Sequence, residues 1–199
     1  EVLPPLQGQH DCDVVVIGGG LCGTSAALHL AQMGVDVVLL EGRKLSQSAS
    51  GRNAGFILQG TAERYNRAVS LMGRDRARRI HAFSLENHRR MAETIETEDI
   101  ACAYRRRGSL QLAGSPLEVE ELEESAALLR EDGFEAVHLT QDGLTPALQH
   151  AGFTMGIHMP ADGELHPAQF VRGVGHAAAR HGARVFEGST VRTLDAGST

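Results

Sequence analysis

The chain has 199 residues, of which 42% are hydrophobic, and a formal net charge of -6. This length allows one large domain or one and a half smaller ones, and the composition is that of an ordinary soluble globular protein with a core. The mildly acidic balance argues against nucleic acid, or an anionic membrane, as the main partner.

The cysteines and histidines form no recognisable ligand pattern. Cys12, Cys22 and Cys102 make no CxxC pair, and the ten histidines form no close cluster. We therefore expect neither a disulfide framework nor a metal site. The first residues lack the basic and apolar regions of a secretory leader, and the longest apolar runs are only strand-length. We expect a cytoplasmic protein with no membrane partner.

The first predicted unit is a strand, a glycine turn, a helix and a second strand. Residues 13–17 are a continuous β-branched run, typical of a central parallel strand buried on both faces. Residues 21–33 have helical apolar spacing and end at Gly34, where a left-handed C-cap fits. Residues 35–40 predict a second buried strand that ends at Glu41. This order predicts a βαβ unit and an α/β, Rossmann-like fold.

After Glu41 the regular alternation stops. Residues 42–60 predict an extended loop with a short helix, and residues 61–72 predict a helix. Residues 74–97 predict a long amphipathic helix. Its expected buried positions are Ile80, Phe83, Leu85, Met91 and Ile95.

The remainder predicts an α+β portion and a last helix. Ser115 and Pro116 open a helix that ends at Gly133, since serine is a good N-cap and proline fits the first turn. His166 and Pro167 open another helix, which ends near Gly182. Strands are expected at 102–104, 109–113, 137–139, 153–159, 184–186 and 190–194, with a turn at Pro146.

The glycine turn carries the strongest chemical motif. Residues 18–23 (GGGLCG) fit GxGxxG between a strand and a helix. Gly18 allows the tight turn, Gly20 lets a pyrophosphate approach the backbone, and Gly23 lets the helix pack closely. The helix N-terminus, where Leu21 and Cys22 lie, offers unpaired N–H groups to phosphate.

Glu41 stands at the tip of the second strand, 21 residues after Gly20. A carboxylate there can accept hydrogen bonds from both hydroxyls of an adenosine ribose and would repel a 2′-phosphate, which disfavours NADP. The alternative is a glutamate that only caps a strand at the surface.

The motif alone fits both FAD and NAD. A NAD domain would continue with another helix and parallel strand, whereas this chain continues with the small-residue segment SQSASGRNAG at 46–55. Such a segment can bring many backbone N–H groups against a long, flat ligand, which favours FAD. A flexible linker and an NAD-linked dehydrogenase remain the alternatives.

At these residues the chain resembles the D-amino-acid-oxidase-like family of FAD-dependent oxidoreductases, and within it the branch of gamma-glutamylputrescine oxidase. The matching stretches are DVVVIGGGLCGTSAALHLAQMGVDVVLLEG at 13–42, SASGRNAGF at 48–56, GSLQLA at 108–113, HPAQFVRGV at 166–174 and GARVFEGSTVRTL at 182–194. They cover nearly all of the chain in order.

The resemblance implies FAD as cofactor and oxidation of a C–N bond of an amine or amino acid by hydride transfer to the flavin. Oxygen or another acceptor would then take the electrons. It implies that the three motif glycines hold the pyrophosphate, and Glu41, with Gly42 beside it, the ribose. It further places Ser50, Gly51, Arg52 and Asn53 along the pyrophosphate and flavin, and the backbone of Val191 at the adenine. His166 is interpreted as a structural helix start, and no catalytic side chain is predicted.

The resemblance also implies a domain layout. After an irregular lead-in at 1–11, residues 12–100 would bind FAD, residues 101–165 would be part of an inserted α+β substrate domain, and residues 166–199 would return to the FAD domain. Family members are considerably longer, so we expect an N-terminal half that lacks the C-terminal half and is inactive alone. A non-catalytic flavoprotein remnant is a further alternative.

Overall fold

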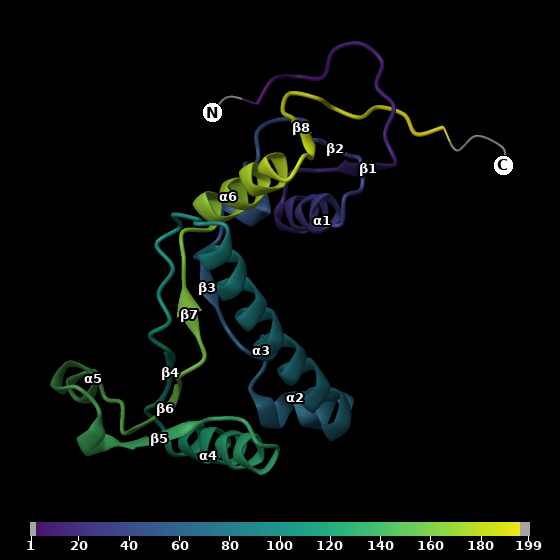
Figure 1. Ribbon diagram of the computed structural model, residues 1–199. Helices are drawn as coiled ribbons and strands as arrows, with labels where there is room; N and C mark the ends of the chain where they lie inside the picture. Colours follow the sequence, from purple (N-terminus) through teal and green to yellow (C-terminus); the bar gives the residue numbers. More distant parts are fainter. Residues whose placement is uncertain (1–2, 196–199) are drawn as a thin grey trace. The chain divides into compact units, whose positions relative to one another are not determined.

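The computed structural model describes residues 3–195 and shows an α/β fold (Figure 1). The chain divides into two compact units. The first comprises the residues up to Gly55, then Thr94–Ala103 and the residues from Leu165 onward. The second comprises Phe56–Glu93 and Tyr104–Glu164.

The first unit is built on a parallel sheet in the order β1-β2-β8. Its strands are β1 (Val14–Ile17), β2 (Val37–Leu40) and β8 (Arg184–Phe186). The helices α1 (Leu21–Gln32) and α6 (Pro167–Arg180) pack side by side on one side of these strands (Figure 1). A short 3-10 helix, η1, covers Ala49–Gly51. The predicted βαβ unit is therefore confirmed.

Local sequence explains where the helices of this unit begin and end. Gly34 follows α1 with φ +79°, a left-handed conformation that glycine adopts at little cost. His166 is the N-cap of α6, where its Nδ1 accepts a hydrogen bond from the Gln169 backbone N–H at 3.4 Å. Pro167 occupies the first turn of the helix. The interpretation of His166 as a structural helix start agrees with this geometry.

Two expectations for the parallel sheet were wrong. β1 was expected to be central and buried on both faces, but it is the edge of the described sheet, and Val15 and Ile17 are 50% and 49% exposed. β2 instead is central, with three of its four residues buried. Residues 190–194 form no strand, because the chain after β8 is held to the loop at 41–43 by backbone hydrogen bonds instead.

The second unit contains an antiparallel sheet in the order β4-β6-β5. Its strands are β4 (Ser109–Ala113), β6 (Met155–Met159) and β5 (Val137–Thr140), and a separate pair joins β3 (Phe56–Ile57) to β7 (Gly163–Glu164). Its helices are α2 (Tyr65–Met72), α4 (Pro116–Glu131) and α5 (Pro146–His150), with a 3-10 turn, η2, at Gln141–Gly143. Pro146 thus starts a short helix. Residues 102–104, which were expected to form a strand beside residues 109–113, form none. The partner of β4 is β6 instead.

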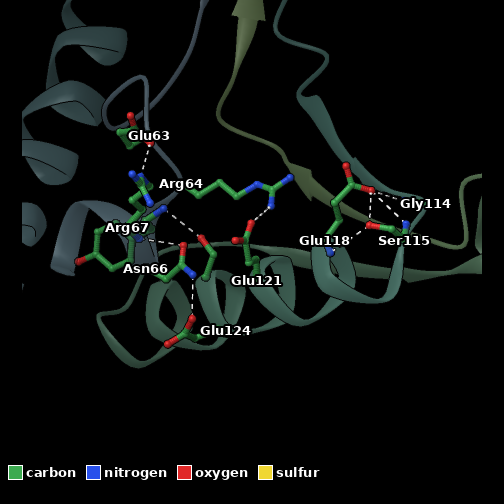
Figure 2. Close-up of polar contacts among 11 residues, drawn as sticks. Glu63, Arg64, Asn66, Arg67, Gly114, Ser115, Glu118, Glu121 and Glu124 are labelled. Carbon is green, nitrogen blue, oxygen red and sulfur yellow. Dashed lines mark hydrogen bonds and ion pairs between the residues drawn. The ribbon is translucent and has the colours of Figure 1, made fainter. Parts of the chain in front are cut away.

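Polar contacts fix the start of α4 and join it to α2 (Figure 2). Ser115 Oγ accepts from the Glu118 N–H, and the Glu118 carboxylate accepts from the Ser115 N–H at 3.0 Å, which completes a capping box. Arg64 donates to Glu121 at 2.7 Å and Asn66 to Glu124 at 2.8 Å. Figure 2 shows both pairs reaching from the segment of α2 to the helix α4.

The long helix α3 (Arg74–Thr97) has the predicted bounds, and four of its five expected buried positions are half-buried, namely Ile80, Leu85, Met91 and Ile95. The prediction for Phe83 was wrong, since this residue is 75% exposed, and the buried residues of the helix are Ala77, His81 and His88. The burial of His81 follows from its neighbours, since Gln59 Oε1 lies 3.0 Å from its Nε2 and Gly60 presents no side chain to it. In the described part of the chain, no helix has the length and apolarity needed to cross a membrane.

Candidate dinucleotide-binding site

The glycine turn after β1 has the geometry that its sequence predicts. Gly18 has φ +102°, and its N–H donates to the Leu40 carbonyl at 2.8 Å, which fastens the turn to β2. A Cβ on Gly23 would lie 1.9 Å from the Gly18 carbonyl oxygen. Only glycine therefore lets α1 approach the turn this closely.

The N-terminus of α1 opens beside Ser50. The N-cap, Gly20, offers no side chain, and the Leu21 N–H donates to Ser50 Oγ at 3.0 Å. A Cβ on Gly20 would lie 3.0 Å from the same oxygen. Leu21, one of the predicted phosphate donors, is thus already bonded to Ser50, while the N–H groups of Cys22 and Gly23 belong to the first turn, which has no intrahelical acceptors.

Glu41 joins the ends of β1 and β2. Its Oε2 accepts from the Gly19 N–H at 2.7 Å, and its Oε1 accepts from the Arg43 N–H at 2.8 Å. Each carboxylate oxygen has a second lone pair, so Glu41 can accept two further hydrogen bonds. Glu41 is half-buried, so part of the residue remains open to solvent.

The loop at 42–55 folds back against the glycine turn. The Ser46 N–H donates to the Gly19 carbonyl at 3.1 Å, and a Cβ on Gly51 would lie 1.9 Å from the Ser46 carbonyl. Asn53 holds the loop in shape, because its Nδ2 donates to the carbonyls of Ala49 and Ser50 and its Oδ1 accepts from the Gly55 N–H. The side chain of Asn53 is therefore engaged within the loop, whereas Arg52 is exposed.

Ser46 is a residue of this site that the sequence did not single out. It has φ +67°, is 4% exposed, and its Oγ has no hydrogen-bond partner among the described residues. A serine hydroxyl in the small-residue segment gives no indication in the sequence that it will be buried beside a glycine turn.

The remaining predicted residues lie at the other end of the same loop. A Cβ on Gly42 would lie 3.0 Å from Thr190 Oγ1, and the Thr190 hydroxyl is 3.4 Å from the Gly42 carbonyl. Val191, the next residue, is half-buried. The structure thus brings Val191 near the end of β2, although not in the expected strand.

Shifted pKa values occur in the second unit. Burial, reinforced by a 2.6 Å hydrogen bond to Asp132, raises the pKa of Tyr65, and the same bond lowers the pKa of Asp132 with the help of Arg74. Burial lowers the pKa of His81 to about 4. These groups lie among packed helices, so their shifts reflect structural contacts. Within residues 3–195, no group of three His, Cys, Asp or Glu side chains could hold a metal ion.

The second unit also has a groove of about 500 Å³. Three exposed apolar side chains line it, those of Phe56, Leu58 and Leu110. Arg64 and Gln111 add polar groups to the wall. Its mixed lining suits a small organic ligand.

A protein-family model and several known oxidoreductases match this chain. The sequence model of the family described as "FAD dependent oxidoreductase" (DAO) matches residues 13–199. A probable oxidoreductase, OrdL, from Haemophilus influenzae is 32% identical over 94% of this chain and 44% of its own length. Gamma-glutamylputrescine oxidoreductase from Escherichia coli is 32% identical over 92% of this chain and 43% of its own length. The chain thus spans less than half the length of these relatives.

Solved structures show the same fold. Glycine oxidase from Geobacillus kaustophilus matches with a TM-score of 0.75 and 21% identity, over 90% of this chain and 47% of its own. L-amino acid deaminase from Proteus myxofaciens matches with a TM-score of 0.72 and 17% identity, over 93% of this chain and 40% of its own. Because both sequence identities are below 25%, these matches support a shared fold and nothing further.

Proposed function

Because the chain belongs to the DAO family of FAD-dependent oxidoreductases, we propose that it binds FAD and forms part of an enzyme that oxidises a C–N bond of an amine or amino acid. The names of its relatives support this substrate class, since gamma-glutamylputrescine and dimethylglycine both contain such a bond. The residues before Gly55 and after Leu165 would hold the cofactor, and the second unit would belong to the substrate domain.

The observation that carries the proposal is the link between Glu41 and the glycine turn. The Gly19 N–H lies 2.7 Å from Glu41 Oε2, so the turn that would receive a diphosphate and the carboxylate that would receive its sugar are neighbours. A glutamate that only caps a surface strand has no need of this position. The free lone pairs of the carboxylate suit two ribose hydroxyls.

The other residues around the turn fit a diphosphate. The first turn of α1 carries the partial positive charge of the helix N-terminus and N–H groups that lack intrahelical acceptors. Ser50 accepts from the Leu21 N–H and retains its own hydroxyl proton, which it can donate to a phosphate oxygen.

When bound, FAD supplies the two-electron acceptor for the oxidation. The chain's own contribution is to bind and orient the cofactor: the turn and Glu41 fix the adenosine end, and the loop at 46–55 fixes the segment that follows. Asn53 keeps that loop folded through its three hydrogen bonds, so we assign it a positioning role.

The proposal is tested by FAD titration of Glu41→Gln in the protein expressed from its natural gene. Glutamine keeps the size of the side chain but removes its charge and half of its acceptor capacity. Charge-assisted hydrogen bonds contribute about 1.5–3 kcal/mol each, so we expect the FAD dissociation constant to rise about 10- to 100-fold. The exposed Glu135 provides the control, Glu135→Gln, which should bind like the wild type. Equal affinities for all three proteins would contradict the proposal.

Titrating the wild-type protein with NAD as well as FAD separates the alternative functions. A protein that binds NAD but not FAD would be a dehydrogenase, and one that binds neither would be a remnant without cofactor. The small-residue loop packed on the glycine turn favours FAD. In an NAD domain, β2 would be followed in the chain by a helix and another parallel strand, whereas here it is followed by this loop.

A further inference from the structure

The second unit has a small, partly open polar pocket that the proposed function does not use. It has a volume of about 40 Å³ and is lined by residues of α2, α3 and α4 and by the sheet residues Gln111 and Met159. A site for one water needs at least about 10–15 Å³, and one molecule of liquid water takes up about 30 Å³. The pocket therefore has room for about one to three water molecules, and it is too small for an amine substrate or a cofactor.

Gln59 lines this pocket and carries an unsatisfied polar group. The residue is 9% exposed, its backbone N–H donates to Asp162 at 2.9 Å, and its Oε1 lies 3.0 Å from His81 Nε2. Its Nε2, by contrast, is buried and has no hydrogen-bond partner among the described residues. A buried donor left unpaired costs about 1–3 kcal/mol, so a partner in the pocket would stabilise the fold.

The need for a partner does not depend on how the amide is oriented. If the amide were turned over, its Nε2 would face His81 Nε2, and its Oε1 would be the atom without a partner. A water molecule can donate as well as accept, so it satisfies either orientation. Ser125, whose Oγ accepts from the Tyr65 N–H at 3.0 Å, still has a hydroxyl proton to donate, and Gln111 adds a second amide to the wall.

We propose that this pocket binds ordered water, held by the side-chain amide of Gln59 and completed by Ser125 and Gln111. The occupant is water because the wall is polar; apolar cavities stay dry. The water fixes the amide of Gln59, and the amide in turn fixes the ring of His81 on α3. The site is thus part of the scaffold of the second unit, and its existence does not depend on FAD binding.

The first test is a crystal structure of the protein at a resolution that shows ordered solvent. We expect density for water within hydrogen-bond distance of the Gln59 amide and of at least one second polar group. A pocket that is empty, filled by a side chain or occupied by another molecule would overturn the proposal. So would a protein acceptor bonded to Gln59 Nε2.

The second test counts long-lived water by oxygen-17 relaxation dispersion in solution. Gln59→Leu keeps the bulk of the side chain but removes the amide, so we expect the count to fall by one or more. The matched control is Gln169→Leu on the exposed face of α6, which should keep the wild-type count. An unchanged count in folded Gln59→Leu would overturn the proposal, and the wild-type crystal structure decides the question if that variant does not fold.

Discussion

Among the glycines of the turn, Gly23 is the one at which an added Cβ would meet backbone atoms. A Cβ on Gly23 would meet the backbone carbonyl of Gly18 at 1.9 Å, and a backbone atom cannot move aside as a flexible side chain can. We expect Gly23→Ala to destabilise the protein by about 3 kcal/mol or more, in the range of large strain effects, as measured by urea denaturation. Gly143→Ala is the matched control, because its Cβ would meet only Leu139 at 3.7 Å and should change stability by about 0.5 kcal/mol or less. Equal effects of the two substitutions would contradict the close approach of α1.

His81 makes stability depend on pH. Its pKa is about 4 in the folded protein, below the ordinary 6.5, because burial disfavours the charged ring more than nearby Asp162 favours it; His88 lowers it further. Between these pH values the unfolded chain binds more protons than the folded one. The free energy of unfolding therefore has its full value, as far as His81 is concerned, above about pH 6.5. It decreases by up to about 3 kcal/mol as the pH falls toward 4.

The pH dependence can be measured with a variant that does not titrate. His81→Gln retains an N–H donor for Gln59 but has no ionisation in this range. We expect the wild type to lose more stability than His81→Gln between pH 7 and pH 4.5, and the exposed-site variant His29→Gln to follow the wild type. Parallel curves for wild type and His81→Gln would show that the ring is not buried as described.

The capping box of α4 is the clearest case in which the sequence sets the start of a helix. Ser115, Pro116 and Glu118 together predict the start of α4, and both reciprocal hydrogen bonds are present. We expect Ser115→Ala to cost about 1 kcal/mol of stability, measured by denaturant unfolding. Ser70→Ala, at an exposed position within α2, should leave stability unchanged or raise it slightly. A neutral Ser115→Ala would mean that the tertiary contacts of Arg64 and Asn66 hold α4 without its cap.

Such local signals explain which elements could be predicted. Four features depend only on short stretches of sequence, and each was predicted correctly: the glycine turn, Gly34, the cap of α4 and the start of α6 at His166-Pro167. The burial of His81 on α3 was not predicted, because its partners, Gln59 and Gly60, come from another segment, which periodicity alone cannot reveal. The exposure of β1 was missed for the same reason: burial of a strand depends on its neighbours in the sheet.

The candidate site likewise combines features that a local sequence pattern predicts with features that depend on distant residues. The closeness of Gly19 and Glu41 follows from two adjacent parallel strands, so the motif spacing predicts it. The positive φ of Ser46 and its buried hydroxyl depend on how the loop folds back on the turn, which no local pattern encodes. The roles of the predicted residues toward FAD remain predictions for the binding experiments.

Each of the two units has its own buried polar link. In the first, the side chain of Glu98 is 6% exposed, and its carboxylate accepts from Gln32 at 3.0 Å, from Arg180 at 3.2 Å and from His181 at 2.9 Å. It thereby ties the residues after α3 to the ends of α1 and α6. In the second, Tyr65 donates to Asp132 at 2.6 Å and ties α2 to the end of α4.

These links predict that the units respond separately to substitution. Glu98→Ala removes three hydrogen bonds to a buried carboxylate and should destabilise the first unit by about 2 kcal/mol or more, whereas Tyr65→Phe removes one and should destabilise the second by about 1–2 kcal/mol. Hydrogen exchange measured by mass spectrometry distinguishes destabilisation of the first unit from destabilisation of the second. Peptides from α6 report on the first unit and peptides from α4 on the second. We expect Glu98→Ala to speed exchange in α6 and leave α4 protected, and Tyr65→Phe to do the reverse. If either substitution speeds exchange equally in both helices, the two units unfold as one cooperative body and the division of the chain has no energetic meaning.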